Sequence, residues 1–223
     1  MNRRQIMQSI IEKTIENLKA NNMDAELVSN RSEALKRVEE LIPEGATVAV
    51  GGSVTLTEMG ILEYLRSGKF NFLDRYKKGI TPEETREIYT RSMSADYYLC
   101  SSNAITEKGE LYNVDGNCNR ISALSFGPKN VIIVAGVNKI VADLGEAVKR
   151  VKLVAAPKNA KRLGLNTYCE KNGKCVCTEI GGLDSPTAGC GSDSRICCSY
   201  LVCGKQKIKN RIKVILVEEE LGY

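Results

Sequence analysis

The chain has 223 residues, of which 43% are hydrophobic and 26% charged, a composition typical of one globular domain with a buried core. No run of about 18 apolar residues predicts a membrane span, and the N-terminal segment lacks the apolar stretch of a secretory signal, so we expect a cytoplasmic protein with no membrane partner. The net charge of +5 comes from 32 basic and 27 acidic residues scattered along the chain, so no nucleic-acid partner is expected.

The sequence contains no histidine. Histidine is the commonest general base and the commonest nitrogen ligand of metals, so both of these roles must fall to other side chains. Acid–base chemistry would rest on Glu, Asp, Lys, Tyr or Cys, and a zinc site would rest on cysteines with or without a carboxylate.

The first third of the chain alternates helical and strand patterns. Apolar residues at helical spacing predict helices over residues 6–18 and 31–42, and the runs AELVS and ATVAVGG predict strands after them. A further helix is expected from about Thr55 to Arg66, ended by Ser67-Gly68, and FNFLD follows as a strand.

The rest of the body continues this alternation. Thr81, Pro82 and Glu84 form a helix start, and that helix should run to about Met93. ADYYLCSSNAIT and GELYNV predict a strand, its turn and a return strand, and residues 119–125, 130–135 and 144–163 predict a helix, a strand and a helix broken near Pro157. IKVILVEEEL should close the chain as a strand. The alternation predicts an α/β fold with a mainly parallel sheet between helices, in a single domain over 1–223.

Basic residues occupy alternate positions from Lys205 to Lys213. A strand here would carry five cations on one face. We expect a solvated face or a charge-protected edge strand rather than an anion site.

The first candidate site is the turn from Gly51 to Thr55, which links a buried strand to a helix. Glycines let the backbone approach a ligand, Ser53 and Thr55 add hydroxyl donors, and a helix N-terminus attracts anions. A tight turn with Ser or Thr capping explains the same residues equally well. Glu58 lies one turn into the helix and would face the same crevice.

The second candidate is a polar run after the next strand, where open α/β sheets bind ligands. It includes Asn103, Thr106, Asn119 and Arg120, with Glu107 at its centre. Ordinary turn chemistry is the alternative.

The third candidate is the cysteine-rich segment over 164–204. Seven of the nine cysteines lie there in the pattern C-x5-C-x-C-x12-C-x6-CC-x4-C. In a cytosolic protein this density favours a metal over disulfides, with free thiols as a further alternative. The spacing fits neither a zinc ribbon nor a ferredoxin, so zinc and an iron–sulfur cluster both stay open.

Over nearly its whole length the sequence resembles the LUD domain family, which includes lactate-utilization protein C. The resemblance is carried by GGSVTLTEMG, by SSNAITEKGELYNVDGNCNRISALSFGPKNVIIVAGVNKIV and by the path from APKNAKRLGLNTYC to SDSRIC. It implies a three-layer α/β/α fold of the ribose-5-phosphate isomerase and CoA-transferase type. It places Gly51, Gly52, Ser53 and Thr55 at the anionic group of a small ligand, with Glu58 and Glu107 as the nearest carboxylates and candidate catalytic residues.

One branch of this family has a cysteine-rich tail, and the match to that tail implies four metal ligands here: Cys169, Cys175, Cys190 and Cys197. The usual proline before the first cysteine is replaced here by Tyr168, and residues 176–189 form an insertion that carries Cys177. Cys198 and Cys203 are also outside the selected set.

Three functions follow from these features. The resemblance favours a lactate-utilization protein that works with iron–sulfur partner proteins in the oxidation of L-lactate to pyruvate. The second is an independent enzyme or sensor for a phosphorylated or CoA-linked ligand, with Glu58 or Glu107 as base or nucleophile. The third is a metal-stabilised, non-catalytic subunit, for which a large apolar homodimer surface is expected.

Overall fold

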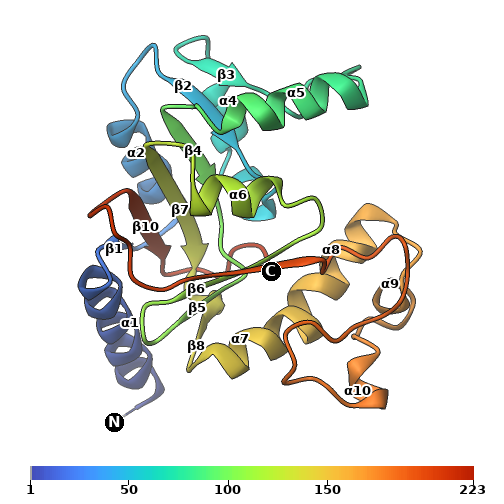
Figure 1. Ribbon diagram of the computed structural model, residues 1–223. Coiled ribbons are helices and arrows are strands. Elements are labelled where there is room, and N and C mark those ends of the chain that lie inside the picture. Colours follow the sequence, from blue (N-terminus) through green and yellow to red (C-terminus); the bar gives the residue numbers. More distant parts are fainter. Residues whose placement is uncertain (1) are drawn as a thin grey trace.

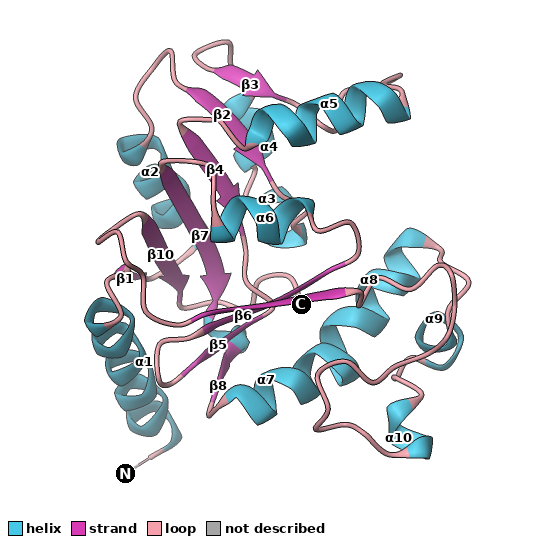
Figure 2. Cartoon of the chain, in the orientation of Figure 1, coloured by secondary structure: helices cyan, strands magenta, loops and turns pink. Residues whose placement is uncertain are grey.

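A computed structural model describes residues 2–223 and shows a parallel six-stranded sheet with helices on both faces (Figures 1 and 2). The strand order is β1-β10-β7-β4-β2-β3, and every neighbouring pair runs parallel. The predicted α/β fold with a parallel sheet is therefore confirmed. The strands are β1 (Asp24–Val28), β2 (Thr47–Val50), β3 (Asn71–Leu73), β4 (Tyr97–Cys100), β7 (Asn130–Gly136) and β10 (Ile212–Val217).

The central strands are apolar on both faces, because helices cover both. Along β7, Ile132 and Val134 join one core while Ile133 and Ala135 join the other, as the two-residue period of a strand requires. The first core is completed by α2 (Arg31–Leu41), α3 (Val54–Glu58) and α4 (Ile61–Leu65). The second is completed by α1 (Arg3–Ala20), α5 (Pro82–Ser92) and α6 (Asn119–Ser125).

A smaller four-stranded sheet, in the order β8-β5-β6-β9, lies beyond the end of the main sheet (Figure 2). The predicted hairpin is present as β5 (Ala104–Thr106) and β6 (Leu111–Asp115), which pair antiparallel. Residues of this sheet and of α7 (Leu144–Arg150) share a third, smaller core. The sheet is completed by β8 (Ile140–Val141), reached through the short 3-10 turn η1 (Val137–Lys139), and by β9 (Ser199–Cys203).

The cysteine-rich segment packs against one long helical stretch. In that stretch α7 passes through a π-helical turn, η2 (Val151–Ala155), into α8 (Ala156–Leu163), so the expected break comes just before Pro157. The segment then forms two short helices, α9 (Tyr168–Asn172) and α10 (Cys177–Ile180), and is otherwise irregular. Buried Lys152 anchors it, because its Nζ donates to the carbonyls of Gly182 and Ser185.

Two expectations about local structure were wrong. The helix expected over residues 55–66 is divided into α3 and α4, because Gly60 adopts a left-handed conformation (φ 71°) between them. Residues 204–211 form no strand, so the alternating cations do not share a face. Arg211 is instead buried, and its guanidinium donates to the carbonyls of Ala123, Leu124 and Pro128.

Over residues 2–223, no helix is both long enough and apolar enough to cross a membrane.

Candidate functional site

Three neighbouring strands of the main sheet end at the same edge, and polar residues follow each of them. The chain leaves β2 toward β3 on one side and leaves β4 toward β7 on the other, so the sheet has a topological switch point between β2 and β4. Open α/β sheets bind ligands outside the carboxyl ends of their strands at such points. Ser53 and Thr55 follow β2, Ser101 and Asn103 follow β4, and Lys139 follows β7.

These segments line a cavity of about 530 Å³, called here the site cavity. Its wall includes only two acidic residues, Asp115 and Asp193. Five basic residues line it: Arg75, Arg120, Lys139, Arg162 and Arg195. Within the described chain, none of the five makes an ion pair with a carboxylate. The site cavity therefore carries an excess of unpaired positive charge, which favours a negatively charged ligand.

Lys139 is the most deeply buried of these basic residues, with 2% of its surface exposed. Its Nζ donates to Thr55 Oγ1 and to Ser101 Oγ, each at 2.9 Å. Burial lowers the pKa of its amine from 10.5 to about 7, and repulsion from Arg150 and Arg120 adds to this effect. The sequence analysis did not select Lys139, although its position directly after an apolar strand is the same signal that selected the polar run after β4.

Arg120 is buried as well, and all the acceptors of its guanidinium are neutral. Nη1 donates to the Ser101 carbonyl and to Asn113 Oδ1, while Nη2 donates to Asn103 Oδ1 and to the Val114 carbonyl. These bonds hold the side chain rigidly but leave its charge uncompensated. Asn113 Nδ2 has no hydrogen-bond partner among the described residues, which marks this corner of the site as incompletely satisfied.

Most of the Gly51–Thr55 turn lies at the site cavity. Gly52, Ser53 and Thr55 line the cavity. Gly51 lies behind it, where a Cβ would come within 2.9 Å of the Tyr98 hydroxyl and 3.0 Å of Arg120. Ser53 caps α3 by accepting from the Leu56 amide, and α3 is only five residues long. The positive character of the site comes from basic side chains rather than from this helix end.

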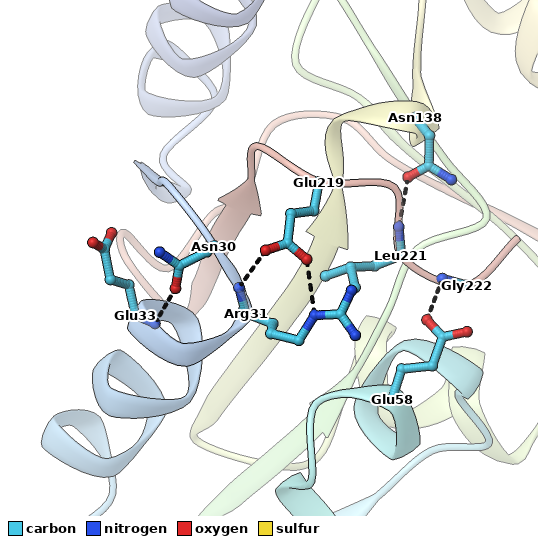
Figure 3. Close-up of polar contacts among 8 residues, drawn as sticks. All are labelled: Asn30, Arg31, Glu33, Glu58, Asn138, Glu219, Leu221 and Gly222. Atoms are coloured by element: carbon cyan, nitrogen blue, oxygen red, sulfur yellow. Dashed lines mark hydrogen bonds and ion pairs between the residues drawn. The ribbon is translucent and has the colours of Figure 1, made fainter.

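The C-terminal tail is held by polar contacts with three other segments, as Figure 3 shows. Glu58 Oε2 accepts from the Gly222 amide at 2.7 Å, and Asn138 Oδ1 accepts from the Leu221 amide at 3.2 Å (Figure 3). A Cβ on Gly222 would lie 3.4 Å from Lys139 Nζ, so the tail packs against one side of that amine. Glu58 thus holds the tail in place and does not line the site cavity.

Four of the cysteines line a second cavity of about 30 Å³, called here the cysteine cavity, and they are the four that the resemblance selected: Cys169, Cys175, Cys190 and Cys197. Cys177 is buried near Lys152 Nζ at 3.5 Å, and Cys198 is exposed. Within residues 2–223, no group of three or more Cys, Asp or Glu side chains is arranged to hold a single metal ion. The two cavities share part of their walls, including Arg195, Ile196 and Cys197.

A family model for the LUD domain matches residues 11–217. The chain belongs to the LUD domain family. This family is associated in general with lactate utilization. A crystal structure of a DUF162 family protein from Deinococcus radiodurans has the same fold, with a TM-score of 0.51 and 16% sequence identity over 95% of this chain and 98% of that one. No curated protein matches the chain.

Two further residues expected at the ligand of this LUD domain lie, like Gly51 and Glu58, outside the wall of the site cavity. Glu107 is in the β5–β6 turn, where its carboxylate pairs with Lys13 of α1 at 3.0 Å. Thr106 stabilises the same turn by donating to Glu110 Oε2. The structure does bring Asn103, Asn119 and Arg120 to the site cavity. The polar run therefore divides between the ligand site and ordinary turn chemistry.

The lowered pKa of Lys139 predicts a pH-dependent stability. The folded amine releases its proton near pH 7 and the unfolded one near 10.5, so between these values the unfolded chain holds more protons and stability rises with pH. We expect the unfolding free energy of the wild type, relative to Lys139→Met, to rise by up to about 1.4 kcal/mol per pH unit in this window. Urea unfolding at several pH values measures it, with exposed Lys149→Met as control. Parallel curves for wild type and Lys139→Met would contradict the shift.

Proposed function

We propose that this LUD domain is a lactate-utilization protein that binds a small organic anion in the site cavity. The observation that carries the proposal is the set of five basic side chains that line the cavity without a carboxylate partner in the described chain. In the cell, the protein would act with iron–sulfur partner proteins in the oxidation of L-lactate to pyruvate. The family association supports this process.

The physical argument rests on burial. A buried, unpaired charge costs several kcal/mol, and a protein ordinarily lowers this cost with a nearby carboxylate. Here Arg120 is satisfied by neutral oxygens only, and Lys139 responds by a lowered pKa. A ligand carboxylate or phosphate would supply the missing negative charge. Binding energy would then come from neutralising the positive charge that the folded protein leaves unpaired.

A second candidate ligand class is favoured by the size of the site cavity. A volume of about 530 Å³ is typical of sites for larger molecules and exceeds what lactate or pyruvate fills. Arg75, which stacks on the rings of Tyr76 and Tyr89, adds a second positively charged region to the cavity that Lys139 lines. A phosphorylated or CoA-linked compound would use both regions at once.

We further propose that Cys169, Cys175, Cys190 and Cys197 hold an iron–sulfur cluster. Thiolates are the ligands that such a cluster requires, and all four line one cavity. When bound, the cluster would supply one-electron transfer. The wall shared through Cys197 supports a link between this group and the ligand site.

Ligand binding is tested by calorimetry with L-lactate, pyruvate, phosphate and coenzyme A. We expect at least one of them to bind, and Arg75→Met to weaken it by tenfold or more, because a lost charge-assisted hydrogen bond is worth about 1.5–3 kcal/mol. Arg91→Met is the matched control, since Arg91 is exposed and pairs only with Glu87. If none of the four binds, or if both variants weaken binding equally, the site is wrong.

The cysteine proposal is tested by metal analysis and a visible spectrum of protein purified anaerobically. A cluster gives a brown protein with a broad absorption at about 400 nm, because charge is transferred from sulfur to iron. Cys190→Ser should lower the iron content, whereas Cys198→Ser should not, because Cys198 is exposed and lies outside the cysteine cavity. A colourless protein with zinc would point to a structural site, and a metal-free protein would contradict the proposal.

A further inference from the structure

Lys139 stands apart from the other basic residues of the site cavity, because its hydrogen bonds fit an uncharged amine. A neutral amine has two N–H donors and a lone pair, whereas an ammonium has three donors. Lys139 Nζ makes two hydrogen bonds within the described chain, to Thr55 Oγ1 and Ser101 Oγ. The two donors of the neutral form are thus satisfied, and its lone pair has no partner.

The two hydroxyl groups are oriented as acceptors for this amine. Thr55 Oγ1 donates weakly to the Leu221 carbonyl at 3.4 Å, and Ser101 Oγ donates weakly to the Ser102 carbonyl at 3.5 Å. With their own hydrogens directed there, both oxygens offer lone pairs to Nζ. Two hydroxyls that follow different strands therefore fix the position of the nitrogen.

Lys152 provides a contrast within the same protein. It is also buried, but its Nζ contacts three partners: the carbonyls of Gly182 and Ser185, and Cys177 Sγ. Three partners match the three donors of an ammonium, and Lys152 lines the cysteine cavity rather than the site cavity. Burial alone therefore does not give a lysine a free lone pair. Lys139 differs from Lys152 because only two acceptors surround its Nζ.

We propose that Lys139 is a nucleophile that forms a Schiff base with the carbonyl of a 2-oxo acid bound in the site cavity. This inference rests on the proposed function and names the substrate class of that same site. A 2-oxo acid carries its carboxylate on the carbon next to the carbonyl. The unpaired basic side chains of the cavity bind the carboxylate, and the carbonyl carbon is then within the cavity that Lys139 lines.

The step balances without any further reactant. The nitrogen lone pair attacks the carbonyl carbon, a C–N bond forms, and the carbonyl oxygen takes up a proton from the nitrogen. The resulting carbinolamine loses its hydroxyl group, which leaves as water with a second proton, and a C=N bond remains. Since the pKa of Lys139 is about 7, roughly half of the amine is neutral at neutral pH, against well under 1% for an exposed lysine.

The experiment traps the intermediate. Wild-type protein is incubated with pyruvate and sodium borohydride, and the adduct is measured by intact mass and located by peptide mapping. We expect one reduced adduct per chain, on Lys139, with none on Lys152 and none when L-lactate replaces pyruvate. Labelling should increase as pH rises through 7. Lys139→Arg should abolish the adduct, and Lys152→Arg should retain it.

The outcomes separate this inference from the proposed function. Pyruvate binding by calorimetry without borohydride-trapped adduct would overturn the Schiff base and leave the anion site standing. An adduct spread over exposed lysines would overturn it as well. If pyruvate neither binds nor reacts while phosphate or coenzyme A binds, the 2-oxo acid is wrong but the anion site is not. Mapping the adduct in the wild type decides the question even if Lys139→Arg does not fold.

Discussion

Lys139 Nζ joins the ends of three adjacent strands, because it follows β7 and donates to hydroxyls that follow β2 and β4. This arrangement is possible only where parallel strands end together, and it places an amine in a region from which water is largely excluded. Arg120 adds a buried positive charge whose hydrogen-bond acceptors are neutral oxygens. This edge of the sheet therefore carries positive charge without a carboxylate partner, and a bound anion would neutralise it.

The segments around this edge then have evident roles. The C-terminal tail is fixed by Glu58, Asn138 and Arg31 (Figure 3), and its Gly222 lies close to Lys139. On the other side, the cysteine-rich segment contributes Arg195 and Cys197 to the wall of the site cavity. A segment with little apolar content is thus positioned by polar contacts, such as those of Lys152, and forms a boundary between the ligand and the four clustered cysteines.

The sequence allowed the parallel sheet to be predicted, because buried strands such as β7 are apolar at successive positions and helical patterns separate them. It also allowed the polar segments after β2 and β4 to be chosen, since ligands bind at carboxyl ends of strands. The basic character of the site was not predictable in the same way. Arg75, Lys139 and Arg195 come from distant segments, and a single lysine after a strand is more often exposed.

The residues that lie away from their expected positions do so for equally specific reasons. Glu58 and Glu107 are carboxylates near the expected crevice in the sequence, but one bonds to a tail that arrives from 164 residues away and the other pairs with α1. The alternation of Lys205 to Lys213 resembled a strand, yet Arg211 is buried and bonds to carbonyls in the last turn of α6 and just after it. In each case a long-range partner, invisible in local sequence, decides where the side chain lies.

The most direct test of the anion site is a crystal of the protein soaked in selenate, with data collected at the selenium absorption edge. Selenate has the charge and about the size of sulfate, and its anomalous signal distinguishes the anion from water and from the atoms of the protein. We predict an anomalous peak inside the site cavity, within hydrogen-bonding distance of Lys139 or of Ser53 and Arg75. Peaks confined to the outer surface, with an empty site cavity at saturating selenate, would contradict the central claim.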